Sequence, residues 1–206
     1  GNHKQIDEWR MQEAIKETLL NRFDWLRSSE LNEQQIALCN KFIPNHYVAL
    51  MHSDVMIADK VGNTTITSLD IHDIARSCKT YGVKNYFIVS GIDDQQKILK
   101  TFLDFWVSGK GKEYNLSRYE AVLNVISAYS LNEVIKEIKE KEEKEPIIIT
   151  TSAKDYKNKS KIDYYSQGMI WQQERPVLFL FGTAQGLSDK ILDRSDYLLL
   201  PIEGLS

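Results

Sequence analysis

The chain has 206 residues, a formal net charge of −3 and 42% hydrophobic residues, which are ordinary values for one or two globular domains. No apolar run approaches the roughly 20 residues of a membrane helix, and the polar N-terminus lacks a signal core. A globally basic nucleic-acid binder is disfavoured, whereas a local basic patch is not. Cys39 and Cys78 lack CxxC spacing, which favours free thiols in a cytoplasmic, reducing compartment over a zinc site or other metal site.

Residues 1–43 are predicted to form a small helical unit. Apolar residues recur at helical spacing from Ile6 to Leu20. A second, short helix is predicted over 31–42, with Ser29 as its N-cap. Pro44 ends the helical pattern, because proline disfavours helix at the residue before it.

From residue 47 onward, short apolar strands alternate with helices. Strands are predicted at 47–52, 86–89, 122–126, 146–150, 177–181 and 197–200. Helices are predicted at 71–81, 95–107, 131–143, 163–173 and 188–193. Continuous apolar strands between helices are typical of a parallel sheet covered on both faces. The sequence therefore predicts an α/β domain over residues 47–206, with a mostly parallel sheet of about six strands.

Three loops after predicted strands could hold a ligand, because ligands of open α/β sheets bind beyond the carboxyl ends of strands. They lie at 150–153, 181–187 and 200–206. Small residues there let backbone groups approach a ligand closely, although for Gly182 and Gly186 taken singly a turn is the simpler explanation. Neither GxGxxG nor GxxxxGK[ST] occurs, which disfavours dinucleotide and P-loop sites.

Charged residues at helical spacing lie early in the helix predicted after the first strand. Asp70, Asp73 and Arg76 are three residues apart and can share a helix face. One interpretation is a surface ion pair of Asp73 and Arg76, which would stabilise little. The other is an arginine at a strand–helix junction that holds a phosphate or positions a nucleophile. His72 alone is more often a structural hydrogen-bonding residue than a catalyst.

Lysines crowd the loop after the fourth predicted strand. Lys154, Lys157 and Lys159 are interleaved with Tyr156 and precede Tyr164. Basic residues mixed with aromatic residues suit phosphate contact and base stacking. A soluble, flexible loop explains the same composition equally well.

Residues 47–206 resemble a SPOUT, or α/β-knot, RNA methyltransferase domain. The segment from Asp70 through Arg76 to Gly82 resembles the family's first motif, in which many members have Asn where this chain has Asp70. The stretches 180–187 and 200–204 resemble the second and third motifs. The resemblance implies a trefoil-knot fold and a homodimer whose site is shared across the interface.

The resemblance also implies an S-adenosylmethionine-dependent RNA methyltransferase that modifies a base or ribose, with tRNA as the expected substrate and no DNA partner. Arg76 and Asp70 are the expected catalytic residues, and Lys154, Lys157 and Lys159 are expected to contact RNA. The residues expected to bind the cofactor are Thr151, Ser152, Ala153, Phe181, Gly182, Thr183, Gly186, Leu200, Ile202 and Gly204.

Residues 1–43 resemble the C-terminal tail of bacterial tRNA (guanine-N1)-methyltransferase, through Gly1-Asn2-His3, Glu8-Trp9-Arg10 and Asp24-Trp25-Leu26. That tail is similar to a small helical RNA-binding unit. The resemblance implies that this chain is part of a natural fusion, in which the catalytic half of a tRNA (guanine-N1)-methyltransferase precedes it. In the SPOUT family a helix after the third motif completes the knot, and the printed sequence stops at Ser206, before that helix. Cofactor affinity and dimerisation are expected to depend on it.

Two other functions stay open. A fused, non-catalytic domain could bind RNA or promote dimerisation for the upstream methyltransferase. A generic doubly wound nucleotide-binding enzyme is disfavoured by the absent glycine fingerprint. Cofactor binding discriminates the first alternative from the methyltransferase, since an accessory domain does not need Gly182.

Overall fold

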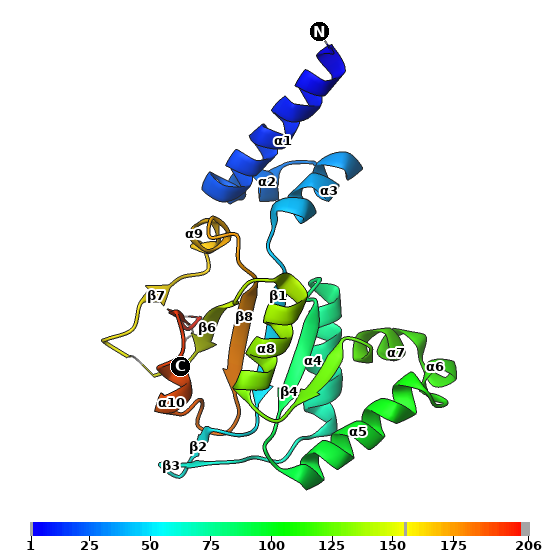
Figure 1. The fold of residues 1–206 in the computed structure, drawn as a ribbon, viewed down its shortest axis with the longest axis vertical. Coiled ribbons are helices and arrows are strands. Elements are labelled where there is room, and N and C mark those ends of the chain that lie inside the picture. Colours follow the sequence, from blue (N-terminus) through cyan, green and yellow to red (C-terminus); the bar gives the residue numbers. More distant parts are fainter. Residues whose placement is uncertain (1, 155, 203–206) are drawn as a thin grey trace. The chain divides into compact units, whose positions relative to one another are not determined.

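A parallel sheet of seven strands runs through the chain from residue 46 onward in the computed structural model, which describes residues 2–154 and 156–202 (Figure 1). The strands lie in the order β5-β4-β1-β8-β6-β9-β7, and all neighbouring pairs are parallel. This arrangement confirms the predicted α/β class. The strand bounds are β1 His46–Met51, β4 Asn85–Val89, β5 Val125–Ala128, β6 Ile147–Thr151, β7 Lys161–Ile162, β8 Val177–Gly182 and β9 Tyr197–Leu199.

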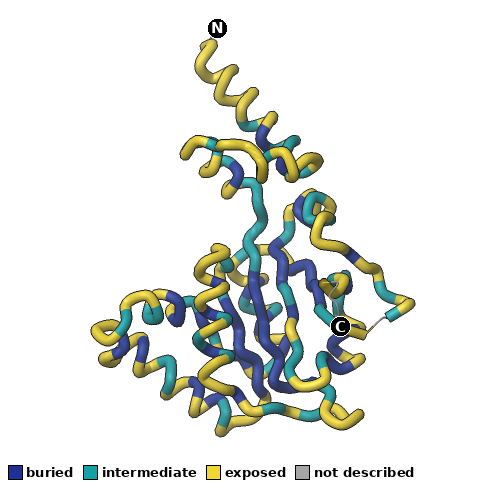
Figure 2. The backbone as a smooth tube through the Cα atoms, turned by 180° about the vertical axis from the view of Figure 1, so that it is seen from behind, coloured by how far each residue is buried: buried dark blue, intermediate teal, exposed yellow. Residues whose placement is uncertain are grey.

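Helices cover both faces of this sheet, as its continuously apolar strands require. Helices α4, α5 and α7 pack on one face, where Ile71, Leu99 and Ala121 meet the strands. Helices α8 and α10 pack on the other face through Val134 and Ile191. Figure 2 shows buried residues concentrated along the central strands. The helix bounds are α4 Ser68–Thr80, α5 Asp93–Val107, α6 Gly111–Tyr114, α7 Leu116–Val122, α8 Leu131–Glu142 and α10 Asp189–Leu192.

The third predicted strand is wrong at its beginning. Residues 122–126 were expected to be extended, but Val122 is the last residue of α7, and β5 starts only at Val125. Val122 is fully buried on the inner side of its helix. A short apolar run does not by itself separate a strand from a buried helical turn, and this run contains the end of one and the beginning of the other.

A hairpin of β2 (Val55–Ile57) and β3 (Lys60–Gly62) is missing from the sequence prediction. Its turn residues Ala58 and Asp59 both have positive φ, at 46° and 64°. Two positive φ values are typical of the turns that suit the twist of a hairpin, and glycine or asparagine usually marks them. The dipeptide Ala-Asp carries no such signal.

Strand β9 lies between β6 and β7, although β7 follows β6 along the chain. Thr151 of β6 and Ile162 of β7 both pair with Leu199 of β9. The connection over residues 152–160 therefore passes from one side of β9 to the other. On the β7 side of the sheet, a strand from near the end of the chain is therefore inserted between two strands that come earlier in the sequence.

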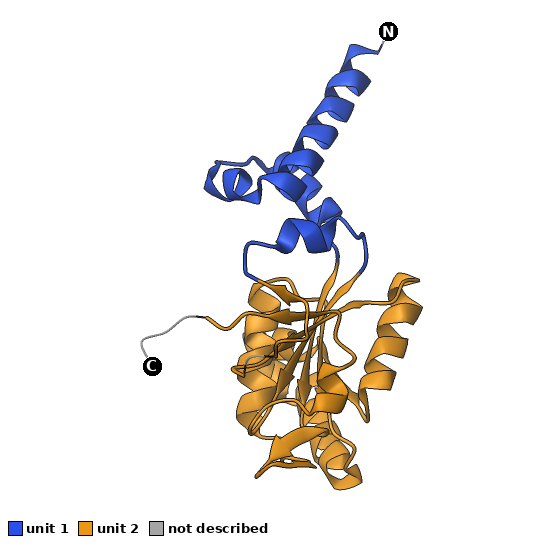
Figure 3. Ribbon diagram, turned by 90° about the vertical axis from the view of Figure 1, so that its left-hand side faces the viewer, with its two compact units in different colours: residues 1–44, 163–175 blue, residues 45–162, 176–206 orange. Residues whose placement is uncertain are grey.

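The chain divides into two compact units, coloured separately in Figure 3. One contains residues 1–44 and 163–175, and the other contains residues 45–162 and 176–206. The sequence-based division into 1–43 and 47–206 assigns residues 163–175 to the second unit, whereas these residues cluster with the first. None of the helices in the described ranges is long and apolar enough to cross a bilayer.

The first unit is built around helix α1, which buries Ile15 and Leu19. Helix α3 packs on it, and its N-cap is Asn32 rather than the expected Ser29. The Asn32 side chain accepts a hydrogen bond from the backbone N–H of Gln35, and the Gln35 side chain accepts one from Asn32. This capping box satisfies two backbone donors at the helix start. The helix bounds are α1 His3–Asn21, α2 Phe23–Ser28, α3 Glu33–Phe42 and α9 Gln167–Trp171.

Helix α9 belongs to the first unit because it packs closely on α1. A Cβ atom on Gly168 would collide with the carbonyl oxygen of Leu20, so the two backbones meet where only glycine fits. Nearby, the rings of Phe23 and Trp171 pack edge to face with centroids 5.3 Å apart. The side chains of Lys16 and Glu174 add an exposed ion pair at 3.7 Å.

We expect Gly168→Ala to destabilise the first unit by about 1–3 kcal/mol, because the new methyl group would overpack a backbone contact. Tryptophan fluorescence during urea unfolding reports this, since Trp9, Trp25 and Trp171 lie in that unit. Gly91→Ala is the matched control, because its Cβ would meet the Ser53 Oγ at an ordinary 3.5 Å. Equal unfolding midpoints for Gly168→Ala and the unmodified protein would contradict the packing described here.

Candidate functional site

Three adjacent parallel strands, β8, β6 and β9, end at the same edge of the sheet. Thr150 of β6 is in register with Leu180 of β8 and with Leu198 of β9. The loops that follow these strands therefore leave the sheet side by side. The residues expected to bind the cofactor lie on or directly after these strand ends, namely Thr151, Ser152, Ala153, Phe181, Gly182, Thr183, Gly186, Leu200 and Ile202. Gly204 lies outside the described residues.

Threonine hydroxyls link β6 to its two neighbouring strands near this edge. The buried Thr150 hydroxyl donates to the carbonyl oxygen of Tyr197 in β9 at 3.3 Å. The Thr151 hydroxyl donates to the carbonyl oxygen of Leu180 in β8 at 3.2 Å. Beyond them, Phe181 and Leu200 are 39% and 38% exposed. At this edge, partly exposed apolar side chains therefore lie beside small residues, on strands that these hydrogen bonds hold in place.

The loop after β8 folds back tightly on itself. A Cβ on Gly182 would lie 2.6 Å from the backbone nitrogen of Leu187. Gly186 has φ of 102°, which L-residues rarely adopt, and its N–H donates to the carbonyl oxygen of Thr183 at 3.0 Å. The turn by itself therefore requires both glycines, and it holds Thr183 and Ala184 at the edge.

The hairpin β2–β3 supports this loop from outside. The N–H of Gln185 donates to the Met56 carbonyl at 3.0 Å, and the N–H of Met56 donates to the Gly186 carbonyl at 2.9 Å. The N–H of Ser188 donates to the Asp54 carbonyl at 2.9 Å. The loop is therefore hydrogen-bonded to a segment in which the sequence predicts neither a strand nor a helix.

Asp70 lies at the same edge, in the first turn of α4. Its Oδ2 accepts hydrogen bonds from the backbone N–H and the hydroxyl of Thr67, both at 2.8 Å, within a capping box. The same oxygen lies 3.7 Å from the Nε2 of His52, which follows β1 directly. His52 is 1% exposed, and burial lowers its pKa while Asp70 partly opposes that shift.

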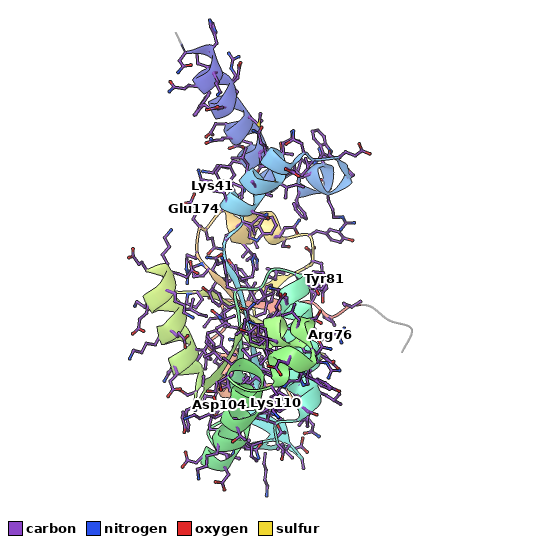
Figure 4. All side chains as sticks on the ribbon, turned by 90° about the vertical axis from the view of Figure 1, so that its right-hand side faces the viewer. Lys41, Arg76, Tyr81, Asp104, Lys110 and Glu174 are labelled. Atoms are coloured by element: carbon purple, nitrogen blue, oxygen red, sulfur yellow. The ribbon has the colours of Figure 1, made fainter. Side chains whose placement is uncertain are left out.

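Arg76 lies on the exposed surface of α4 rather than at the strand–helix junction predicted for it. The helix runs from the carboxyl edge of the sheet toward the amino edge, where the Lys84 N–H donates to the His46 carbonyl. Arg76 is about 9 Å beyond Asp70 along the helix axis. Figure 4 labels Arg76 part-way along α4 and Tyr81 at the helix end. Asp73 and Arg76, which both lie in the described range 2–154, form no ion pair within 4.0 Å, so the surface ion pair expected for them is absent.

His72 is surrounded by aromatic side chains of α5. Its ring packs edge-on against Phe102 and Trp106 of α5, with centroid distances of 5.0 and 5.2 Å. Burial lowers its pKa, and the charge of Arg118 lowers it further. The ring is therefore packed among aromatic side chains of α5. Its buried Nδ1 has no hydrogen-bond partner among the described residues, so the expected structural hydrogen bond is not seen at this nitrogen.

The three lysines after β6 have different surroundings. Lys154 and Lys157 are exposed, whereas Lys159 is only 22% exposed at its side chain and pairs with Asp193 at 3.3 Å. Tyr156 packs against the core of the sheet. Two cations of this loop are therefore presented to solvent.

Among the cavities lined by described residues, two lie away from these strand ends. One of about 740 Å³ lies within the first unit and is lined by residues of 20–28 and 164–169. The other, of about 380 Å³, lies between α5 and the end of β5. Within the described ranges, no group of three or more His, Cys, Asp or Glu side chains could hold a metal ion.

We expect the free energy of unfolding to fall on acidification from about pH 7.5 to about pH 5.5. His52 and His72 have folded pKa values below the usual 6.5, so the unfolded chain takes up protons first as the pH drops. Urea titrations at several pH values measure this slope. The double variant His52→Asn, His72→Asn should flatten it, and an unchanged slope would exclude these two side chains as its cause.

The chain matches a family model described as SAM-dependent RNA methyltransferase over residues 45–206. A protein of Oleidesulfovibrio alaskensis named tRNA (guanine-N(1)-)-methyltransferase is 34% identical over 211 residues, covering 100% of this chain and 49% of that protein. An uncharacterized protein of Aquifex aeolicus is 35% identical over 161 residues, which are 78% of each chain.

A solved structure of a methylase family protein from Neisseria gonorrhoeae shares the fold, with a TM-score of 0.51 and 14% identity over 86% of this chain and 76% of that one. The chain spans about half the length of the named tRNA methyltransferases that it matches. The family model covers all seven strands of the parallel sheet and the three strand ends described above. The chain belongs to the family of S-adenosylmethionine-dependent RNA methyltransferases.

Proposed function

We propose that the chain holds S-adenosylmethionine, the cofactor of its family, at the carboxyl ends of β8, β6 and β9, and that it methylates RNA there. The observation that carries this proposal is the convergence of the three motif-like loops on adjacent parallel strands. Ligands of open α/β sheets bind beyond such strand ends.

The residues at this edge suit the cofactor. Small residues at 151–153 and the glycines of the loop after β8 leave backbone groups within reach of an adenosine. Phe181 and Leu200 are partly exposed and can cover apolar parts of the ligand. When bound, the cofactor supplies an electrophilic methyl group on a sulfonium. The chain's own residues bind it and orient it against the acceptor atom of the RNA.

Arg76 and Asp70 are proposed to act on the RNA. An acceptor nitrogen or oxygen loses a proton on methylation, and the carboxylate of Asp70 at the carboxyl edge is the proposed proton acceptor. Arg76 lies farther along α4, away from the strand ends of its own sheet. We infer that it serves the site of a second copy in a homodimer, where its guanidinium can hold a phosphate.

We propose tRNA as the substrate, within a polypeptide longer than these 206 residues. The support is the name of two relatives that match 100% and 98% of the chain, tRNA (guanine-N(1)-)-methyltransferase. The helical unit of residues 1–44 aligns with them as well, because the match covers 100% of this chain. The exposed Lys154 and Lys157 are the proposed phosphate contacts.

The direct test is a calorimetric titration with S-adenosylhomocysteine, performed on the natural polypeptide that contains these residues. Gly182→Ala should weaken binding at least about 10-fold, because its methyl group displaces the Leu187 backbone and with it the loop. Gly91→Ala is the control and should bind normally. A fused upstream methyltransferase half would bind the ligand as well and would not respond to this substitution. If Gly182→Ala weakens none of the binding sites of the polypeptide, the chain is the non-catalytic fused domain instead.

The lysine contacts can be tested by RNA gel shifts at increasing salt. Lys154→Ala with Lys157→Ala should weaken tRNA binding and reduce the salt slope by about 1.5, because two phosphate contacts are lost. Lys100→Ala with Lys136→Ala removes the same charge from exposed positions on α5 and α8 and serves as control. An unchanged slope for the first pair would exclude Lys154 and Lys157 as phosphate contacts.

A further inference from the structure

A partly buried chain of hydrogen bonds joins the end of β1 to the loop after β8. The Nδ1 of His52 lies 3.0 Å from the Oγ1 of Thr64, which lies 2.6 Å from the Oγ1 of Thr183. The Thr183 hydroxyl in turn lies 3.0 Å from the carbonyl oxygen of Met51. Thr183 is the first residue after β8 and belongs to the proposed cofactor loop.

The last acceptor in this chain fixes the direction of all its hydrogen bonds. A carbonyl oxygen can only accept, so the Thr183 hydroxyl donates to Met51. Thr64 must then donate to Thr183, because each hydroxyl has one proton. The remaining contact needs a proton on Nδ1 of His52. In this direction all three short contacts carry a proton.

The opposite direction leaves one contact without a proton. If Thr183 donates to Thr64 and Thr64 donates to Nδ1, the Thr183 oxygen faces the Met51 carbonyl at 3.0 Å with no hydrogen between them. The His52 proton would then be on Nε2, whose nearest carboxylate oxygen, on Asp70, is 3.7 Å away, beyond hydrogen-bond reach. Nε2 is buried and has no hydrogen-bond partner among the described residues.

We propose that His52 is a positioning residue that carries its proton on Nδ1 and, through Thr64, holds the Thr183 hydroxyl and so the cofactor loop in its binding conformation. This inference rests on the proposed cofactor site. His52 is too deeply buried to touch a ligand itself. Asp70 is the one charged side chain described as interacting with the His52 ring. A second proton, on Nε2, would face Asp70 and would leave the hydrogen bonds from Nδ1 through Thr64 to Thr183, here called the relay, intact.

The proton position can be measured without any ligand. Long-range ¹⁵N–¹H spectra of the full chain above neutral pH should show a pyrrole-type Nδ1 and a pyridine-type Nε2 for His52, with the signal assigned by its loss in His52→Asn. This tautomer is the less common one for histidine in water. A pyrrole-type Nε2 would overturn the proposed direction of the relay.

The effect on the loop is measured by S-adenosylhomocysteine affinity. Thr64→Val removes the middle hydroxyl at constant shape and should weaken binding roughly 3- to 10-fold, since a neutral hydrogen bond contributes about that much. Thr65→Val, at the exposed neighbour, is the matched control. Amide exchange of residues 183–186 should be faster in Thr64→Val alone. Wild-type affinity in Thr64→Val would overturn the positioning role.

Two histidine substitutions separate positioning from simple loss of packing. The amide N–H of Asn can replace the Nδ1–H donor, whereas that of Gln reaches the position of Nε2. His52→Asn should therefore keep the affinity for S-adenosylhomocysteine within about 2-fold of that of the unmodified chain. His52→Gln should lose as much affinity as Thr64→Val. Equal losses in both variants would contradict the relay. If the unmodified chain does not bind the ligand, the cofactor site itself fails, and the ¹⁵N spectra still decide the tautomer.

Discussion

Strand β9 forms hydrogen bonds with β6 on one side and with β7 on the other, and the chain must pass over it between those two strands. This insertion brings the C-terminal segment into the middle of a layer made by earlier residues. It also sets the end of β9 beside the ends of β6 and β8, so that three loops distant in sequence meet at one edge. The site depends on backbone pairing more than on particular side chains.

Much of this edge could be predicted from the sequence. The strands are continuous apolar runs, and the glycines at 182 and 186 mark a tight return after β8. Because strand ends are where ligands bind in such sheets, the candidate residues followed from the strand positions and the motif resemblance. Residue-level roles within that edge stay predictions.

Other features had no local signal. Predicting α4 from Ile71 put Arg76 near the junction, but the Thr67–Asp70 capping box starts the helix earlier and moves Arg76 deeper into it. His52 and Thr64 are separated by a hairpin whose turn lacks glycine, so nothing indicated that they meet. The contact of Gly168 with α1 is likewise visible only in three dimensions.

The polypeptide crosses between the two units at residues 44–45, 162–163 and 175–176. The first crossing leads into β1, the second leaves β7, and the third enters β8 at Val177. The units are therefore interwoven along the backbone, unlike modules joined by one flexible tether. Proteolysis at a single crossing would not release either of them. Freeing the first unit intact would take cuts at all three crossings, because residues 163–175 are flanked on both sides by segments of the second unit.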